Sequence, residues 1–417
     1  VVQKVDTAVD VVIVGAGAAG LMAAVWAGRT YPQQQILLLD GARKLGAKIL
    51  VSGGGRCNVT HDQVDAAAYA GASRNAIKKV LKRFDVPQTT EFFRDLGVTL
   101  KREDTGKLFP TTDSSQTILQ ALLTAVSRTN VTIQHPYRVE TIHKTATGFQ
   151  VRGAWGSIAA KRVILATGGR SLPKSGSDGH GYQLAQALGH TLREPIFPAL
   201  VPLTLPNGHF VRTLSGITLP ATLTVSASNG KKLVEFTDST LCTHFGLSGP
   251  AVLDISRHFI AAQQDDPGSS LSINWLPALS ATELDTALQA LARKSVLNYL
   301  RLHLPERLAT ALCHEAGVPL ETEGSQLTRS ARRALVQQIS QCPLPISGNR
   351  GYNYAEVTAG GVPLHELDLK TMQSRICPGL FCCGEICDVD GRIGGYNFQW
   401  AWASGYTAGV SVGQPDT

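Results

Sequence analysis

The feature that most constrains the fold is a glycine-rich turn near the start of the chain, between an apolar run and a helical run. Residues 10–14 read Asp-Val-Val-Ile-Val, a β-branched run typical of a parallel strand that is buried on both faces. Residues 15–20 read Gly-Ala-Gly-Ala-Ala-Gly, and residues 21–27 continue as an apolar helical segment. A strand, GxGxxG and a helix in this order predict the start of a βαβ unit that binds a dinucleotide.

The three glycines of this turn have separate physical roles in such a unit. Gly15 makes the tight turn, Gly17 allows a pyrophosphate to approach the backbone, and Gly20 packs the helix on the strand. The pyrophosphate then lies at the helix N-terminus, beside Ala18 and Ala19. Free backbone N–H groups and the helix dipole favour negative charge there.

An acidic residue at the end of the next strand completes the pattern. Residues 36–39 form a second apolar run, and Asp40 follows it, twenty residues after Gly20. A carboxylate at this place accepts hydrogen bonds from the ribose hydroxyls of an adenosine. The sequence therefore predicts a dinucleotide site, with a glycine-rich turn that binds no ligand as the alternative.

Two further glycine clusters and a C-terminal motif favour FAD as the dinucleotide. Ser-Gly-Gly-Gly-Arg-Cys-Asn occupies residues 52–58, and Ala-Thr-Gly-Gly follows a buried strand at residues 166–169. A resident NAD needs only the first cluster, whereas the longer flavin dinucleotide needs more backbone contacts. In the C-terminal motif, acidic residues such as Glu385 are expected to accept ribityl hydroxyls. The N-terminus of a helix at 398–408 is expected to stabilise negative charge on the N1/C2=O edge of a reduced flavin.

Longer motifs give a wider resemblance. They are GAGAAGLMAA at the start, Lys44-Leu45-Gly46-x-Lys48 with SGGGRCNVT, FPTTD, ATGGRSLPKSGSDGHGY, PALVPL, THFGLSGP, TAGGV and GEICDVDGRIGGYNFQWAWASGYTAG near the end. In this combination, over nearly the whole chain, the sequence resembles the HI0933-like (YhiN/BaiN-type) family of NAD(P)/FAD-dependent oxidoreductases. The resemblance implies non-covalently bound FAD. It also implies an α/β fold: a glutathione-reductase-like (Rossmann-type) FAD-binding domain with an inserted β-barrel-like plus helical domain.

The predicted cofactor-binding residues come from all of these motifs. They are Gly15, Gly17, Ala18, Ala19, Gly20, Asp40, Lys44, Lys48, Ser52, Gly53, Gly54, Gly55, Arg56, Asn58, Val139, Ala166, Thr167, Gly168, Gly384, Glu385, Asp390, Gly394, Gly395, Tyr396, Asn397 and Gln399. Among them, Lys48 and Arg56 are expected to neutralise the pyrophosphate or a reduced flavin, with a solvated basic face as the alternative. No metal site is predicted.

The chain changes character around residue 195, where four prolines fall in a short apolar stretch. Beyond it, Asn229-Gly230 between two alternating runs predicts a β-hairpin, and residues 282–340 show helical periodicity. We therefore predict an FAD-binding domain built from residues 1–194 and 346–417. The insertion between them, residues 195–345, is expected to be β-rich at 195–278 and helical at 279–345.

Two residues are candidates for catalysis. His244 lies in THFGLSGP, where Ser248 is a predicted helix N-cap and Pro250 a first-turn proline. A histidine there can act as a general acid or base near neutral pH, and the alternative is a histidine that only stabilises its loop. Cys57, in the second glycine cluster, is a candidate redox partner of the flavin. Flavin disulfide reductases use a paired cysteine motif that this chain lacks, so packing is the alternative for Cys57.

The charge balance favours anionic partners without identifying them. Lysine and arginine number 39 and acidic residues 32, a net charge of +7, which suits nucleic acid and phosphorylated cofactors alike. One basic run, without an acid between residues 73 and 84, contains Arg74, Lys78, Lys79, Lys82 and Arg83. A second set, in the insertion, contains Arg293, Lys294, Arg301, Arg307, Arg329, Arg332 and Arg333. No aromatic interleaving or known RNA module accompanies them, so a nucleic-acid partner is not expected.

Composition and cysteine spacing indicate the cellular compartment of the protein. With 43% hydrophobic and 17% charged residues, the chain is not mostly disordered. No apolar run approaches the ~20 residues of a membrane helix, and no secretory signal pattern is present. The 8 cysteines have neither the spacing of a zinc site nor the density of a disulfide scaffold. We expect a cytoplasmic protein without a membrane partner, and the oligomeric state stays open.

These observations predict an FAD-dependent oxidoreductase. Hydride transfer at flavin N5 is expected to involve a small organic substrate, with NAD(P)H or dioxygen as the redox partner. No second GxGxxG follows a strand, so NAD(P)H would act as a transient donor. The alternatives are an FAD-dependent tRNA-modifying enzyme and a flavin-binding sensor without turnover.

Overall fold

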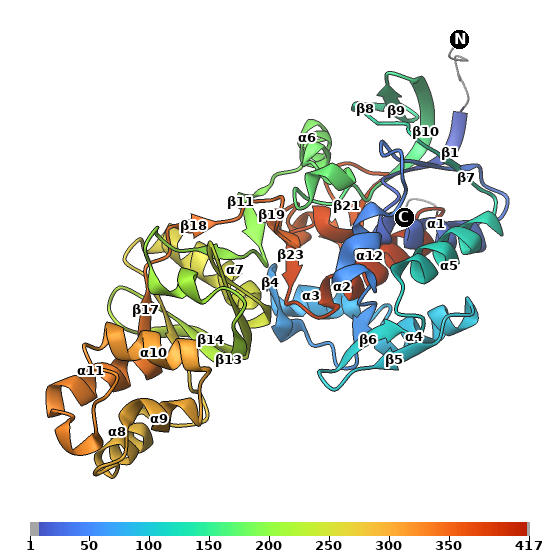
Figure 1. Ribbon diagram of the computed structural model, residues 1–417. Coiled ribbons are helices and arrows are strands. Elements are labelled where there is room, and N and C mark those ends of the chain that lie inside the picture. The colour runs from blue at the N-terminus through green and yellow to red at the C-terminus, as the bar shows by residue number, and fades with distance from the viewer. Residues whose placement is uncertain (1–7, 415–417) are drawn as a thin grey trace. The chain divides into compact units, whose positions relative to one another are not determined.

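The computed structural model describes residues 8–414 and divides the chain into two compact units (Figure 1). Unit 1 takes in the N-terminal part of the chain up to Pro198 and the C-terminal part from Glu356, and unit 2 is Ala199–Ala355. The chain thus returns to unit 1 at residue 356, whereas we expected the return at 346. The difference arises because β18 (Gly348–Asn349) pairs with β12 (Leu203–Thr204) inside unit 2.

The core of unit 1 is a parallel sheet around β1 (Ala8–Val14). β1 pairs with β10 (Gly156–Leu165) on one side and β2 (Ile36–Leu39) on the other. Beyond these lie β22 (Leu380–Cys382) and β7 (Val131–Gln134). All of β2 and the last four residues of β1 are buried. Strands covered on both faces are continuous runs of Val, Ile and Leu, and the predicted βαβ start and Rossmann-type fold are confirmed.

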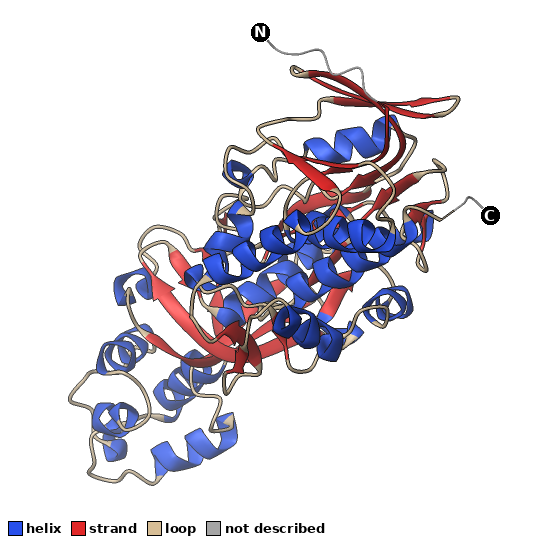
Figure 2. Cartoon of the chain, turned by 90° about the vertical axis from the view of Figure 1, so that its right-hand side faces the viewer, coloured by secondary structure: helices blue, strands red, loops and turns tan. Residues whose placement is uncertain are grey.

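Helices and shorter strands complete unit 1. Its helices are α1 (Ala18–Thr30), α2 (Ala47–Gly55), α3 (Arg74–Leu81), α4 (Val86–Asp95), α5 (Ser115–Ser127), α6 (His180–Ala187) and α12 (Tyr396–Ser411). Its other strands are β3 (Thr60–His61), β4 (Tyr69–Gly71), β5 (Leu100–Arg102), β6 (Lys107–Pro110), β8 (Thr141–Thr145), β9 (Gly148–Gly153), β11 (Arg193–Ala199), β19 (Val357–Gly361), β20 (Leu367–Asp368), β21 (Gln373–Ser374) and β23 (Val389–Gly391). β5 and β6 form an antiparallel hairpin, and helices lie against the central strands (Figure 2).

Two helices from opposite ends of the chain, α1 and α12, pack closely against each other. A Cβ atom at Gly405 would lie 2.5 Å from the carbonyl oxygen of Ala19, and one at Gly409 would lie 2.6 Å from that of Ala23. Only glycine permits this approach of the two backbones. Because Gly405 is level with Ala19 and Gly409 with Ala23, the two helices run in the same direction.

Unit 2 is built on an antiparallel sheet in the order β17-β16-β13-β14-β15-β12-β18. Its strands not yet introduced are β13 (Thr218–Ser226), β14 (Lys232–Thr243), β15 (Gly246–Ser248), β16 (Ser270–Asn274) and β17 (Cys342–Leu344). Its helices are α7 (Pro250–Asp265), α8 (Ala281–Gln289), α9 (Val296–Arg301), α10 (Glu306–Glu315) and α11 (Arg329–Ser340). The hairpin β13–β14 turns at Asn229-Gly230 as predicted, with φ 83° at Gly230. In the described part of the chain, the end strands β17 and β18 are not paired with each other.

None of the helices described between residues 8 and 414 is long and apolar enough to span a membrane.

The packing of α1 on α12 predicts the effect of replacing Gly405 by alanine. Alanine favours an exposed helix by about 1 kcal/mol over glycine, but here its methyl group meets the Ala19 carbonyl oxygen. Overpacking of this kind costs about 1–3 kcal/mol. We expect the free energy of unfolding of G405A, measured with denaturant, to fall below the wild-type value. An unchanged or higher value would contradict the close approach.

Candidate functional site

The first glycine turn connects β1 to α1, and protein packing explains two of its three glycines. Gly15 has φ 101°, and a Cβ atom there would lie 2.5 Å from the carbonyl oxygen of Ala166. A Cβ atom at Gly20 would lie 1.8 Å from the carbonyl oxygen of Gly15. Larger residues at these two positions are therefore excluded by the chain itself, whether or not a ligand binds.

Gly17 is different, because the protein does not require a glycine there. Its φ is −79°, which any residue adopts, and no heavy atom lies within 4 Å of a Cβ atom built on it. The residue is the N-cap of α1, and no side chain caps this helix end. The space beside Gly17 is therefore open at the end of α1, where the first-turn backbone N–H groups of Ala18 and Ala19 have no side-chain cap and suit a phosphate. The pyrophosphate of a dinucleotide fits this turn.

Asp40 lies beside this turn, at the end of β2. Its carboxylate accepts hydrogen bonds from the N–H of Ala16 at 2.6 Å and the N–H of Ala42 at 2.7 Å. The carbonyl oxygen of Asp40 accepts the N–H of Tyr137 at 2.7 Å, and Val139, two residues further, is buried. The structure thus brings Asp40 and the Val139 segment to the same end of the sheet as the first glycine turn. Lys44 lies in the following loop and is exposed.

The second glycine cluster forms a left-handed turn at the end of α2. The helical geometry breaks at Ser52, with ψ 147°, and Gly53, Gly54 and Gly55 all have positive φ. Alanine or larger residues are strained in this conformation, which explains three consecutive glycines. The space beside Gly54 is open, since no atom lies within 4 Å of a Cβ atom there. Asn58, after the turn, is buried.

Arg56 does not have a free charge to offer a cofactor. Its guanidinium donates to Glu103 at 2.6 Å, lies 3.7 Å from Asp113 and covers the ring of Phe109 at 4.0 Å. This arrangement ties the second glycine cluster to the β5–β6 hairpin. The expected neutralisation of a pyrophosphate by Arg56 therefore has no support in the structure.

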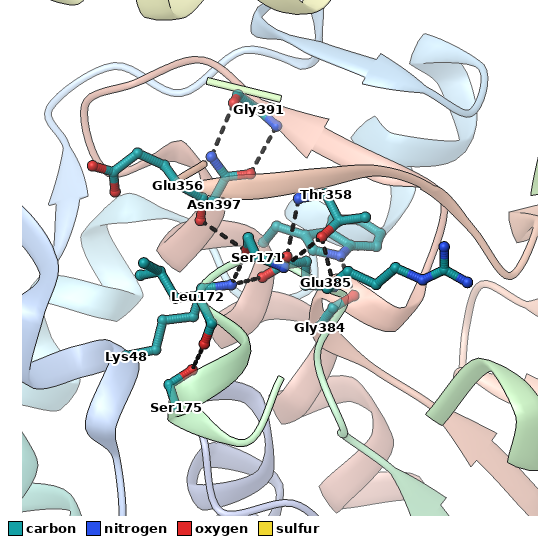
Figure 3. Close-up of polar contacts among 12 residues, drawn as sticks. Lys48, Ser171, Leu172, Ser175, Glu356, Thr358, Gly384, Glu385, Gly391 and Asn397 are labelled. Atoms are coloured by element: carbon teal, nitrogen blue, oxygen red, sulfur yellow. Dashed lines mark hydrogen bonds and ion pairs between the residues drawn. The ribbon is translucent and has the colours of Figure 1, made fainter. Parts of the chain in front are cut away.

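Four segments distant in sequence meet at Glu385 (Figure 3). Its carboxylate pairs with the ammonium of Lys48 from α2 and accepts the hydroxyl of Ser171 at 2.8 Å and the N–H of Thr358 at 3.0 Å. Lys48 also donates to the hydroxyl of Ser171 at 2.5 Å. The charge of Lys48 is thus balanced inside the protein. Sequence reasoning missed Ser171 and Thr358, which lie in the ATGGRS and TAGGV motifs.

The electrostatic effect of this cluster reaches Glu356, the residue at which the chain returns to unit 1. Desolvation by the surrounding protein raises the pKa of Glu356, and the nearby Glu385 carboxylate raises it further, while Lys48 opposes both. Glu356 therefore keeps its proton to higher pH than an ordinary glutamate. Its backbone carbonyl accepts the hydroxyl of Ser171 at 3.2 Å (Figure 3).

The third glycine cluster follows β10 and contacts the first. The N–H of Ala166 donates to the carbonyl oxygen of Val14 at 2.9 Å. Thr167 packs against the start of α6, where a Cβ atom at Gly181 would lie 1.8 Å from its hydroxyl oxygen. Gly168 has φ 72°, a left-handed conformation. The first and third clusters therefore form one continuous glycine-lined surface.

The C-terminal motif ends at another helix N-terminus that no side chain caps. The N-cap of α12 is Gly395, with φ 98°, and no side chain caps this end. Asn397 holds the preceding loop closed, because its side-chain amide exchanges hydrogen bonds with the backbone of Gly391 at 2.8 and 2.9 Å (Figure 3). Tyr396 stacks on His61 with ring centroids 5.1 Å apart. Three further predicted residues lie nearby: Gly384 in the turn after β22, buried Asp390 in β23, and Gly394 in the loop.

Gln399 is a correction to the predicted set. It is buried, and its amide accepts the hydroxyls of Thr60 and Thr89 and donates to the carbonyl oxygen of Phe84. All of its side-chain bonds therefore hold α12 to α4 and β3. The side chain is thus packed among α12, α4 and β3.

The two catalytic candidates belong to different units. Cys57 is fully buried, and burial raises the pKa of its thiol to about 12, so it holds no nucleophilic thiolate at neutral pH. The geometry favours the packing interpretation of Cys57. His244 lies in unit 2, exposed on the β14–β15 hairpin. Ser248 is not the N-cap of the next helix, since it belongs to β15 and Gly249 caps α7, but Pro250 is the first helical residue as predicted.

Among residues 8–414, no three His, Cys, Asp or Glu side chains are arranged to hold a metal ion.

The open space at Gly17 predicts a separation of folding from cofactor binding. We expect G17V to fold, because its side chain meets no protein atom, and to lose FAD, because it occupies the place of the pyrophosphate. The measurements are the flavin-to-protein absorbance ratio and the unfolding temperature of the cofactor-free forms. The contrasting variant is G15V, whose side chain meets Ala166 and which we expect to misfold. A fully yellow G17V protein would refute this placement.

Burial of the thiols predicts their reactivity. All eight cysteines are buried, and a protonated thiol does not react with alkylating agents. We expect iodoacetamide at about pH 8 to leave the native protein unmodified and to label every cysteine after unfolding in guanidinium. Rapid labelling of Cys57 in the native protein, seen by peptide mass spectrometry, would restore it as a redox candidate.

Comparison with known proteins agrees with this geometry. Residues 9–411 match the HI0933-like protein Rossmann domain. The chain is 36% identical over 400 residues to the ribosomal RNA dihydrouridine synthase of Escherichia coli, covering 95% of this chain and 96% of that protein. It is 35% identical over 407 residues to the 3-dehydro-bile acid delta(4,6)-reductase of Clostridium scindens, covering 96% and 98%.

The fold is also found among solved structures. A chain of Escherichia coli quinol fumarate reductase superposes with a TM-score of 0.53 at 17% identity, covering 98% of this chain and 70% of that chain. With a glycine-lined surface, an acidic residue after β2 and two uncapped helix ends, the chain has what an FAD site requires. The chain therefore belongs to the HI0933-like family and is an FAD-dependent oxidoreductase.

Proposed function

We propose that the protein reduces a carbon–carbon double bond conjugated to a carbonyl group, and that its substrate is a uridine of ribosomal RNA. The names of the two relatives describe this one chemistry on different molecules. The uracil C5=C6 bond is conjugated to the C4 carbonyl, and a 3-keto steroid with double bonds at positions 4 and 6 is a conjugated dienone. In uracil, the carbon β to the C4 carbonyl gains a hydride and the α-carbon gains a proton. In the dienone, the hydride adds to the β- or the δ-carbon, the far end of the reduced double bond from the carbonyl, and the nearer carbon of that bond gains the proton.

When bound, FAD supplies hydride chemistry at N5. The residues of the protein hold and orient the cofactor. The α1 N-terminus at Gly17 would hold the pyrophosphate, and the α12 N-terminus at Gly395 would stabilise negative charge at the N1/C2=O edge. NAD(P)H acts as the transient donor in this proposal, since no second GxGxxG follows a strand in the sequence.

The basic face of α3 is the observation that favours RNA over a small molecule. The buried side of this helix consists of Ile77, Val80 and Leu81. Five basic residues lie on α3 and at the two positions that follow it. They are Arg74, Lys78, Lys79, Lys82 and Arg83; all are exposed, and none forms an ion pair with a residue of the described chain. Unpaired cations at this density suit a polyanion. The proposal therefore departs from our sequence-based expectation that no nucleic acid is involved.

Three of the seven basic residues of the second set are engaged by contacts within unit 2. Arg301 pairs with Glu306 at 2.5 Å, and Arg332 pairs with Asp285 at 2.8 Å. Arg307 donates to backbone carbonyl oxygens, at 2.5 Å in the case of Thr213. The helix α3, which packs against α12 in unit 1, is therefore the stronger candidate for phosphate contacts.

The reaction is tested with the purified flavoprotein and NADH or NADPH, without oxygen, on two substrates. One is protein-free ribosomal RNA that lacks dihydrouridine, and the other is a 3-keto-4,6-diene steroid. We expect digested RNA to contain a nucleoside heavier than uridine by two hydrogens, seen by mass spectrometry. Unchanged RNA with a consumed steroid would instead identify a small-molecule reductase. Reactivity with neither substrate would also contradict the proposal.

The role of α3 is tested by neutralising its lysines. Each lost phosphate contact lowers the slope of log affinity against log salt by about 0.9, so K78Q/K79Q/K82Q should bind RNA more weakly and with a shallower salt dependence. The control is R128Q/K370Q, which removes two exposed cations of unit 1 that also have no acidic partner in residues 8–414. Equal effects of both sets would mean that net charge alone attracts RNA.

A further inference from the structure

One arginine of unit 2 is held in an unusual way that the proposed reaction does not use. The guanidinium carbon of Arg350 lies 4.3 Å from the ring centroid of Phe245 and 3.8 Å from that of Tyr354. Two aromatic rings therefore hold one cation. Sequence reasoning missed this site because 105 positions separate Phe245 from Arg350.

Both loops that form this stack are anchored to β12. The N–H of Arg350 donates to the carbonyl oxygen of Pro202 at 3.1 Å, and the carbonyl oxygen of Phe245 accepts the N–H of Leu205 at 3.0 Å. A tight turn, with the N–H of Tyr354 donating to the carbonyl oxygen of Gly351 at 3.1 Å, brings Tyr354 back over Arg350. The side chains are thus held by the sheet edge before any ligand arrives.

The guanidinium is fixed but its hydrogen-bond donors are not used. Within residues 8–414, Arg350 has no side-chain hydrogen bond and no acidic partner. A guanidinium that contacts aromatic rings through its faces keeps the N–H donors of its plane available for other partners. Arg350 therefore presents a preorganised fork of donors for phosphate or carbonyl oxygens.

The outer side of the stack is open to a second planar group. Tyr354 is 53% exposed, although large aromatic residues are usually well covered. Its inner face lies on Arg350, so its outer face is available. His244, exposed on the neighbouring hairpin, lies edge-on to Phe245 with ring centroids 5.1 Å apart. A nucleotide combines a planar base, which can stack on Tyr354, with a phosphate anion, which Arg350 can bind.

We infer that Phe245, Arg350 and Tyr354 form a nucleotide-binding site of unit 2, here called the Arg350 stack. In this site an RNA base stacks on the outer face of Tyr354, and Arg350 binds the phosphate of the same strand. The inference rests on the proposed action on RNA and adds to it a place where the strand is held. It assigns His244 to the border of this site.

The test measures binding of a short fluorescent oligouridine strand to the FAD-containing protein by anisotropy. Stacking on one aromatic side chain contributes about five- to hundredfold in affinity, so Y354A should lose that factor and Y354F should keep wild-type affinity. R350A should weaken binding about tenfold or more, and R350K should recover only part of it. Flavin content and unfolding temperature, equal to wild type, show that the variants are folded.

A second strand separates base recognition from simple charge attraction. On a strand of the same length with abasic sites, Y354A should bind like wild type, whereas R350A should still bind weakly. The matched control is R29A, because Arg29 also lies over an aromatic ring, at 5.2 Å from Trp26, but belongs to unit 1. R29A should bind both strands like wild type.

The outcomes distinguish this inference from the proposed function. If wild-type protein reduces uridine in RNA while Y354A and R350A bind both strands like wild type, the reaction stands and the Arg350 stack is refuted as a nucleotide site. If the stack variants lose binding as described but wild-type protein forms no dihydrouridine, the site stands and the proposed reaction fails. A wild-type protein that binds neither strand refutes the site.

Discussion

The close packing of α1 on α12 is the interaction on which the candidate site depends. Gly405 and Gly409 bring the two helix backbones together at Ala19 and Ala23, so segments from opposite ends of the chain form one unit. Both helices begin at an uncapped glycine. Because they run in the same direction and Gly405 is level with Ala19, the N-terminus of α12 extends about 12 Å beyond that of α1. One rigid pair of helices thus presents two separate anion-stabilising ends, as an extended dinucleotide requires.

The glycines of the first turn show how a structure without ligand can still indicate one. Gly15 and Gly20 are explained by neighbouring backbone atoms, but Gly17 faces open space in an ordinary conformation. A glycine at this place is what the approach of a pyrophosphate to the backbone requires. The same reasoning separates the charged residues, because Lys48 and Arg56 are satisfied inside the protein, whereas the cations of α3 and Arg350 are not. Charged groups that have no partner within the protein therefore indicate ligand sites better than residue type alone does.

Local patterns made much of the fold predictable from the sequence. The βαβ start, Asp40 and the hairpin at Asn229-Gly230 depend on neighbours along the chain. No local sequence pattern predicts the cluster at Glu385, because its partner Lys48 is 337 positions away in the chain. A single sequence also does not show whether a polar side chain faces a ligand or the core. For this reason Gln399 was predicted to bind the cofactor, although its side chain holds α12 to its neighbours.

A crystal structure of the protein with FAD is the most direct test of the account. The account predicts the pyrophosphate oxygens against the backbone N–H groups at Gly17 and the start of α1. It also predicts the C2=O edge of the isoalloxazine facing the start of α12 at Tyr396. FAD bound elsewhere, or a pyrophosphate contacted by side-chain cations instead of the α1 N-terminus, would contradict the claim that the two helix ends form the cofactor site.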